Sequence, residues 1–215
     1  LGVLKAGGAY LPLDPEYPAQ RLSFMIGDSG SVFVISDGAL YAGLDTQDAV
    51  LPPQIDVYDA ALLQQLEDLP DGVIAPSERI APLQPEHLAY LIYTSGSTGV
   101  PKGTALAHQN LLHYLLWARK TYPCDYGIGA PINTSIAFDA TITSLWLPLI
   151  SGSHVSLFSG VDDIEELAKQ LNQQSGFSLV KLTPIHMDVL CNTLDPESLS
   201  EQTRSYIVGG EQLNA

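Results

Sequence analysis

One run of ten residues, 94–103, combines the side chains and the backbone freedom that a phosphate group needs. It reads Thr-Ser-Gly-Ser-Thr-Gly-Val-Pro-Lys-Gly and follows the apolar run 88–93, which is typical of a buried strand. Its glycines permit backbone angles closed to other residues, so successive N–H groups can converge on an anion. The pattern predicts a phosphate-binding loop between a strand and a helix, with contacts from Thr94, Ser95, Gly96, Ser97, Thr98, Gly99, Lys102 and Gly103.

The loop differs from the common phosphate-binding motifs. In the Walker A pattern a Ser or Thr follows the lysine and holds magnesium, whereas Gly103 follows Lys102 here and Pro101 precedes it. The G-x-G-x-x-G fingerprint of dinucleotide-binding folds is absent as well. A plain flexible surface loop is the alternative interpretation, and the lysine between the flanking elements argues against it.

The composition limits the classes of partner. The chain has 215 residues, 46% hydrophobic and 15% charged, which suits a globular protein with a substantial core. A net charge of −15 argues against nucleic acid and anionic membranes as partners. The same charge repels ATP, so a nucleotide site must supply its own donors and a magnesium ion. Two isolated cysteines and five histidines without metal-ligand spacing predict free thiols in a reducing cytoplasm and no zinc site.

Strand-like and helix-like segments alternate along the chain. We expect strands at 32–35, 88–93, 155–158, 179–182 and 206–208, and helices at 18–28, 106–117, 162–175 and 184–194. The alternation predicts an α/β fold with largely parallel sheet layers and flanking helices, whose ligands bind at the carboxyl ends of strands. Residues 37–87, rich in proline and acids, predict a variable surface excursion with one short helix at 58–66.

Three further motifs accompany the loop. Residues 4–14 read Leu-Lys-Ala-Gly-Gly-Ala-Tyr-Leu-Pro-Leu-Asp, a packing segment in which paired glycines let two backbones approach closely. Residues 136–141 read Ile-Ala-Phe-Asp-Ala-Thr, and Asp139 there stands in an otherwise apolar run, where it could cap a helix. Residues 207–213 read Ile-Val-Gly-Gly-Glu-Gln-Leu.

In their order and separation these motifs resemble the adenylation domains of nonribosomal peptide synthetases, which belong to the adenylate-forming (AMP-dependent synthetase and ligase) superfamily. The string 4–14 is much more typical of these domains than of CoA ligases. The resemblance covers almost all of residues 1–215 and implies a partial AMP-binding domain, a piece of the large N-terminal subdomain of that fold. The catalytic lysine of the C-terminal subdomain is absent, so we expect this polypeptide alone to be inactive.

The resemblance implies a reaction and a set of residues. The carboxylate of an amino acid attacks the α-phosphorus of ATP, expels pyrophosphate, and the acyl group of the resulting adenylate passes to the phosphopantetheine of a carrier-protein domain. ATP and Mg²⁺ are the implied cofactors, Lys102 and Thr98 the catalytic residues, and Gly210 and Glu211 further nucleotide contacts. The implied amino-acid pocket comprises Asp139, Ala140, Thr143, Lys181, Ile207 and Gly209.

This set looks like the lining of domains that activate aspartate or asparagine. Asp139 would bind the substrate ammonium, a contact that a CoA ligase does not need. An unpaired buried ammonium is costly, so Lys181 needs a partner anion if it lies inside; otherwise it is a lysine at a sheet edge. We predict aspartate first and asparagine second, with a methylated aspartate as a variant. A CoA ligase and a non-catalytic nucleotide-binding remnant are the alternatives.

Overall fold

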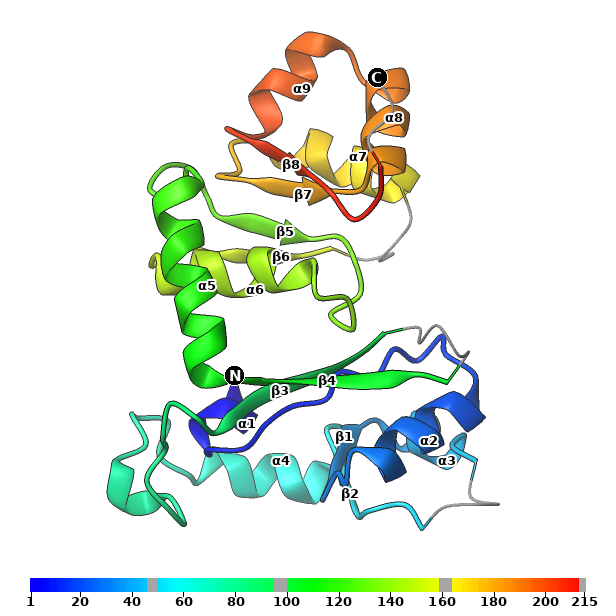
Figure 1. The fold of residues 1–215 in the computed structure, drawn as a ribbon, viewed down its shortest axis with the longest axis vertical. Coiled ribbons are helices and arrows are strands. Elements are labelled where there is room, and N and C mark those ends of the chain that lie inside the picture. Colours follow the sequence, from blue (N-terminus) through cyan, green and yellow to red (C-terminus); the bar gives the residue numbers. More distant parts are fainter. Residues whose placement is uncertain (46–49, 95–99, 159–163, 213–215) are drawn as a thin grey trace. The chain divides into compact units, whose positions relative to one another are not determined.

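The structure, a computed structural model, describes residues 1–45, 50–94, 100–158 and 164–212. It divides into two compact units, Leu1–Gln109 and Asn110–Ala215. In both units short strands alternate with helices (Figure 1), which is the mixed α/β architecture expected from the sequence. Among the described strands, three of the four pairs are parallel. The predicted fold class is confirmed.

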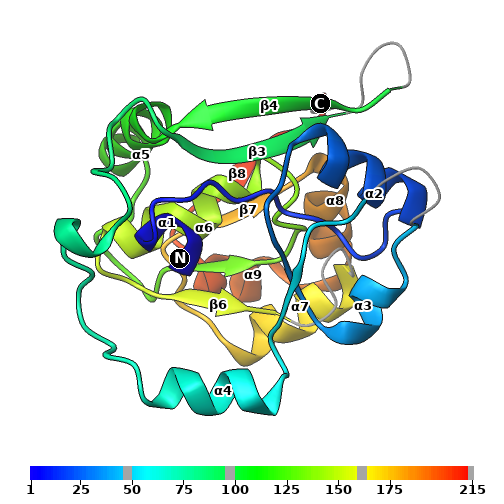
Figure 2. The same ribbon diagram turned by 90° about the horizontal axis from the view of Figure 1, so that it is seen from below.

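The first unit surrounds two strand pairs with short helices. Its strands are β1 (Val34–Ser36), which pairs in parallel with β2 (Gln54–Asp56), and β3 (Leu88–Thr94), which pairs antiparallel with β4 (Lys102–Ala107). Figure 2 shows β3 and β4 running side by side. The helices are α1 (Gly2–Lys5), α2 (Ala19–Asp28), α3 (Gly38–Ala42) and α4 (Ala60–Glu67), with a 3-10 turn at Pro76–Glu78.

Strand β4 corrects the predicted helix at 106–117. The chain returns from the loop as a strand, and helix α5 (His108–Thr121) begins only after Ala107. The predicted phosphate loop therefore joins the two strands of a hairpin, and not a strand and a helix. The physical reason is that the backbone N–H and C=O groups of a buried strand need partners, and β4 supplies them along β3.

Residues 37–87 contain more structure than a surface excursion with one helix. Helix α4 lies close to the predicted 58–66, but α3 and β2 also fall within this range. Strand β2 is required because β1 would otherwise have unpaired backbone groups, and its three residues pair with the three of β1.

The second unit pairs β5 (Ala130–Ile132) with β6 (Val155–Leu157) and β7 (Val180–Leu182) with β8 (Tyr206–Val208), both in parallel. Its helices are α6 (Thr141–Ile150), α7 (Ile164–Gln173), α8 (Pro184–Thr193) and α9 (Pro196–Gln202), and Figure 1 shows α6 alongside β5 and β6. The predicted strands at 179–182 and 206–208 and the helix at 184–194 are confirmed within about one residue. Residues 162 and 163, the start of another predicted helix, lie outside the described residues.

The two faces of strand β7 lie in different environments, one in the hydrophobic core of this unit and the other outside it. Val180 and Leu182 are buried in the cluster formed with Leu167, Ala168, Leu171, Phe177 and Leu190. Because side chains alternate across a strand, Lys181 points to the other face, where it is half-buried. After the strand, the Thr183 hydroxyl accepts a hydrogen bond from the His186 N–H and caps α8. In the described part of the chain, no helix has both the length and the apolar character needed to cross a membrane.

Candidate functional site

The described ends of the predicted phosphate loop are fixed by the hairpin. Thr94 and Lys102 are cross-strand partners at the loop end of the β3–β4 ladder. Both are exposed, so a hydroxyl and an ammonium are accessible to an anion from solvent. Ser95, Gly96, Ser97, Thr98 and Gly99 lie outside the described residues.

The base of the loop is braced by Tyr93, whose role the sequence motif did not indicate. Its phenol donates a 2.6 Å hydrogen bond to the Asp28 carboxylate at the end of α2. Burial, and then the bond to and the charge of Asp28, raise the pKa of Tyr93, so the phenol stays protonated and remains a donor. This bond ties the end of β3 to α2.

Gly103 also has a steric role in the hairpin. It is the cross-strand partner of Tyr93, and a Cβ at this position would lie 3.0 Å from the Tyr93 ring. Its φ is not among the left-handed values found at other glycines of the chain. Gly103 therefore does not use the left-handed backbone angles that glycine permits, and its phosphate contact stays a prediction.

The donors at the hairpin suit phosphate oxygens better than a metal ion. Thr94 and Lys102 offer a hydroxyl and an ammonium, and an ammonium cannot ligate a cation. Among the described residues, no three His, Cys, Asp or Glu side chains are grouped so that they could hold a metal. Mg²⁺ commonly binds through substrate phosphates, water and only one or two carboxylates. These residues therefore fit a triphosphate, and a magnesium ion would have to come with it.

Several residues of the predicted amino-acid pocket meet around β7. Lys181 is in register with Ile207 of β8. Gly209 lies just beyond β8, where its N–H donates a 3.0 Å hydrogen bond to the Leu182 carbonyl. Because partners in register point to the same face of a sheet, the Ile207 and Lys181 side chains lie on one face of the β7–β8 pair.

Helix α6 contributes from the same face. The Lys181 ammonium donates a 3.0 Å hydrogen bond to Thr143 Oγ1, and Thr143 is completely buried. Ala140 is the N-cap residue of α6, about one turn before Thr143. Burial lowers the pKa of the Lys181 ammonium, and the charge of Asp139 opposes this shift. Lys181 and Asp139 are therefore near enough to interact electrostatically, and their assignment to a substrate stays a prediction.

Asp139 does not serve as a helix cap. Helix α6 begins at Thr141 with Ala140 as N-cap, and no side-chain cap bond is present there. The carboxylate of Asp139 is exposed, and only its backbone carbonyl bonds to the helix, by accepting from the Ile142 N–H. The helix-cap alternative for Asp139 is therefore wrong.

Two polar residues that the sequence did not indicate complete this region. The Tyr114 hydroxyl of α5 lies 2.6 Å from Thr143 Oγ1. Asn133, only 6% exposed, donates a 3.2 Å hydrogen bond from Nδ2 to the Lys181 carbonyl. A tyrosine in a helix and an asparagine after a strand carry no signal in the sequence, because their roles depend on contacts between distant segments.

The predicted nucleotide contacts Gly210 and Glu211 follow β8 at its carboxyl end. Both are exposed, and Gly210 has a φ of 93°, a conformation that residues with a side chain rarely adopt. The turn directs the chain away from the strand at the edge where α/β folds bind ligands.

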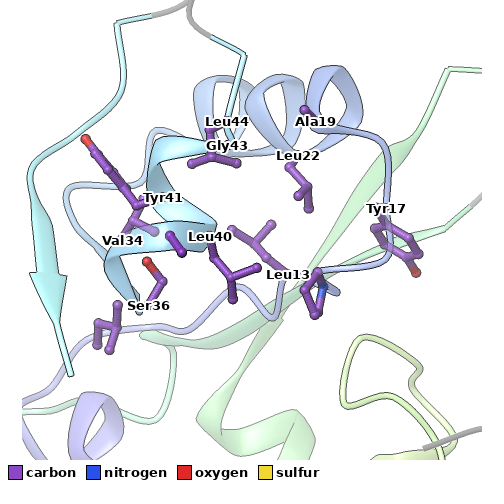
Figure 3. A pocket seen from close by; sticks show the side chains of 13 residues that line it. Leu13, Tyr17, Ala19, Leu22, Val34, Ser36, Leu40, Tyr41, Gly43 and Leu44 are labelled. Carbon is purple, nitrogen blue, oxygen red and sulfur yellow. The ribbon is translucent and has the colours of Figure 1, made fainter. Parts of the chain in front are cut away.

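A separate cavity of about 300 Å³ lies within the first unit (Figure 3). Its lining comes from α2, α3, β1 and the segment before α2, and it is mainly apolar, with Leu13, Leu22 and Leu40 directed into it. The Tyr41 hydroxyl at its edge donates to the Pro52 carbonyl. Among the described residues that line this cavity there is no lysine or arginine, so it lacks the positive charge expected of a nucleotide site.

Comparison with known sequences places these features in context. The chain matches the family of AMP-binding enzymes over residues 1–215. It is 36% identical over 214 residues to bacitracin synthase 3 of Bacillus licheniformis, covering 99% of this chain and 3% of that protein. It is 35% identical over 214 residues to tyrocidine synthase 3 of Brevibacillus parabrevis, again covering 99% of this chain and 3% of that protein. The chain thus spans only a small part of the length of these relatives.

Solved structures share the fold. The nonribosomal peptide synthetase FmoA3 superposes with a TM-score of 0.77 at 22% identity, over 99% of this chain and 22% of that one. A four-domain nonribosomal peptide synthetase, AB3403, bound to AMP and glycine, gives 0.72 at 27% identity, over 99% and 15%. A malonyl-CoA ligase gives 0.73 at 23% identity, over 99% and 43%. Peptide synthetases and CoA ligases therefore share this architecture, so the fold alone does not separate them.

Proposed function

We propose that this chain, which belongs to the AMP-binding enzyme family, forms part of a site that activates an amino acid with ATP in nonribosomal peptide synthesis. The product is an aminoacyl adenylate, whose acyl group passes to the phosphopantetheine thiol of a carrier-protein domain. Aspartate is the favoured substrate and asparagine the second. The observation that carries this proposal is the half-buried Lys181 ammonium, bonded to Thr143 and influenced by the Asp139 carboxylate.

Asp139 is assigned to the α-ammonium of the substrate. Its carboxylate is exposed and takes no part in capping α6, so it is available for a charge-assisted hydrogen bond. A CoA ligase for fatty or aryl acids has no ammonium to bind and would gain nothing from a carboxylate here. This residue therefore favours amino-acid activation over the CoA-ligase alternative.

Lys181 is assigned to the side chain of the substrate. An ammonium has three donors, and within the described residues the hydrogen bond to Thr143 uses one of them. Partial burial makes an anionic partner valuable, and the carboxylate of aspartate would supply it. The carboxamide of asparagine is neutral, so it would accept a weaker hydrogen bond in which only the ammonium carries a charge. Glutamate is longer by one methylene, which costs roughly 1–3 kcal/mol in a fitted pocket. Ala140, Ile207 and Gly209 would form the rest of the wall.

The hairpin is assigned to the phosphates of ATP. Thr94 and Lys102 are exposed at its loop end, and the segment 95–99, including Thr98, joins them in the proposal. Lys102 would offset the charge that develops on pyrophosphate as it leaves, a contribution by positioning and electrostatics. Magnesium, when bound with the nucleotide, would neutralise part of the phosphate charge. Gly210 and Glu211 are proposed as further nucleotide contacts.

Exchange of pyrophosphate into ATP tests this function. The full-length protein that carries these residues is assayed with aspartate, asparagine, β-methylaspartate, glutamate, leucine, phenylalanine and an aryl acid. We expect the highest kcat/KM with aspartate, then asparagine, and a lower value with glutamate. A preference for leucine or phenylalanine would contradict the assignment of Lys181, and exchange with the aryl acid alone would favour a CoA ligase.

A further inference from the structure

We propose that Tyr114 is a positioning residue for amino-acid selection: its hydroxyl holds the Thr143 hydroxyl, which in turn holds the Lys181 ammonium toward the substrate side chain. This inference rests on the proposed function, and it adds a residue that no pocket motif contains. Three segments far apart in the sequence, α5, α6 and β7, each contribute one member of the chain Tyr114–Thr143–Lys181.

The geometry makes Thr143 the centre of the chain. Its Oγ1 lies 2.6 Å from the Tyr114 hydroxyl and 3.0 Å from Lys181 Nζ, and both distances are within the range of good hydrogen bonds. Thr143 is completely buried, so water does not compete for its hydroxyl. A buried hydroxyl without partners is costly, and these two contacts satisfy it.

The chemistry of the three groups gives the chain a direction. An ammonium can only donate, so Thr143 Oγ1 must accept from Lys181. One lone pair and one proton of the Thr143 hydroxyl remain, and the Tyr114 oxygen can use either of them. In both cases the bond to Tyr114 fixes the rotation of the Thr143 hydroxyl, which keeps a lone pair directed at the ammonium.

The backbone of Lys181 is held separately. Asn133 donates to its carbonyl, and β8 pairs along the strand at Ile207. The long side chain of a lysine is nevertheless flexible, with four carbons between backbone and ammonium. Among the described residues, Thr143 is the only one with a hydrogen bond to the Lys181 ammonium. A group that orients the Thr143 hydroxyl therefore also orients the ammonium that would bind the substrate side chain.

Tyr114→Phe in the full-length protein tests the inference. The substitution removes the hydroxyl but keeps the ring, which lies 5.9 Å from the Trp117 ring between centroids. We expect KM for aspartate to rise about tenfold, the factor that corresponds to ~1.4 kcal/mol, while KM for ATP stays unchanged. Tyr126→Phe is the matched control, because Tyr126 is 67% exposed and its ring, which stacks on Arg204, is retained; its kinetics should equal those of the wild type.

A double-mutant cycle separates positioning from general stability. Thr143→Val removes the hydroxyl at nearly constant volume, and Tyr114→Phe should add no further effect in that background, since Tyr114 acts through Thr143. Thr143→Ser keeps the hydroxyl and should restore a KM close to that of the wild type. Melting temperatures of all variants show that the proteins compared are folded.

The outcomes distinguish this inference from the proposed function. If the wild type activates aspartate or asparagine but Tyr114→Phe has the same KM, only the role of Tyr114 is overturned. Additive effects of the two substitutions, or an equal rise of KM for ATP, would overturn it too. If the wild type activates neither amino acid, the proposed substrate is wrong and the inference falls with it.

Discussion

The two proposed binding regions, one in each unit, are encoded in different ways. The phosphate loop is one continuous run of sequence, and its described ends depend on a single hairpin, β3 with β4. The proposed amino-acid pocket would be assembled from α5, α6, β7 and the segment after β8, through Tyr114, Thr143, Lys181 and Gly209. A continuous site can be recognised from its motif, whereas an assembled site depends on the fold to bring its members together.

This difference extends to exposure. Thr94 and Lys102 are exposed, so substitutions there should alter ATP chemistry and leave the fold intact. Thr143 is fully buried and Lys181 half-buried, so substitutions there change packing and binding together. Substitutions in the two regions should therefore differ in how strongly they change the kinetic constants and the free energy of unfolding.

The largest effect is expected for Asp139→Ala. Loss of a carboxylate that pairs with the substrate ammonium should lower kcat/KM for the amino acid by a factor that corresponds to about 2–5 kcal/mol of lost transition-state stabilisation. ATP binding should stay nearly unchanged, because the nucleotide is assigned to other residues. Calorimetric titration with ATP and exchange assays with aspartate measure the two effects. Asp188→Ala, an exposed aspartate on α8, is the control. Equal loss of both activities would contradict the assignment.

The loop is tested by Lys102→Ala. Removal of a charge-assisted phosphate contact should cost about 1.5–3 kcal/mol in kcat/KM for ATP. The free energy of unfolding should change by less than about 0.5 kcal/mol, since the side chain is exposed. Lys120→Ala, at an exposed lysine in the last turn of α5, should change neither quantity. A sharp fall in melting temperature with normal kinetics would mean that Lys102 is structural.

Lys181→Ala sharpens the pocket side of the comparison. The variant should lose about 1.5–3 kcal/mol of selectivity for aspartate over leucine, because only the acidic side chain uses the ammonium. Competition assays with both amino acids in one mixture measure the ratio directly. Loss of activity by the same factor for every amino acid would show that Lys181 supports the fold and does not select the substrate.

A smaller effect is expected at the base of the hairpin. Gly103→Ala places a Cβ 3.0 Å from the Tyr93 ring, and this ring is held by the bond to Asp28. The crowding should lower the free energy of unfolding by about 1 kcal/mol. Gly72→Ala is the control, since a Cβ there meets no atom within 4 Å. Equal stability of the two variants in denaturant unfolding would show that Tyr93 can move aside.

The smallest effect at neutral pH is expected for the pH dependence of KM for aspartate, and this effect grows toward alkaline pH. Burial lowers the Lys181 pKa from its ordinary 10.5, so the ammonium is lost as pH rises through this lowered value. KM for aspartate should therefore rise at a pH below 10.5, where an ordinary lysine is still charged. Leucine is the control substrate: loss of the proton from the substrate α-ammonium, which Asp139 would bind, raises KM for both amino acids, and only aspartate should show the additional rise due to Lys181. Identical alkaline profiles for both amino acids would contradict the assignment.

Sequence periodicity predicted the elements that are amphipathic or bounded by clear turn residues. Strands β3, β7 and β8 and helix α8 lie where the pattern indicated. Helix α6 was considered only as a helix that Asp139 could cap. Its sequence, Thr-Ile-Thr-Ser-Leu-Trp-Leu-Pro-Leu-Ile, is apolar and β-branched on nearly all sides and has no polar face to mark a helical period. Strand β4 was assigned in part to a helix, since its identity depends on pairing with β3.

The site shows the same division. The loop, Asp139 and Lys181 follow from motif and charge, because each is an unusual residue for its surroundings. The contacts of Tyr114 and Asn133 were not predictable, since each reaches a residue at least 29 positions away along the chain. The steric role of Gly103 was not predictable for a related reason, since it depends on Tyr93, its neighbour across the hairpin.

The alternation along β7 has a consequence for mutational tolerance. Val180 and Leu182 belong to the hydrophobic core, and Lys181 between them faces away from it. Substitutions at 181 should therefore disturb the packing of α7 and α8 less than substitutions at 180 or 182, so 181 is the position of this strand at which the side chain can change at the lowest cost in stability. A library that varies position 181 alone should accordingly yield a higher proportion of folded variants than libraries that vary the buried positions 180 or 182.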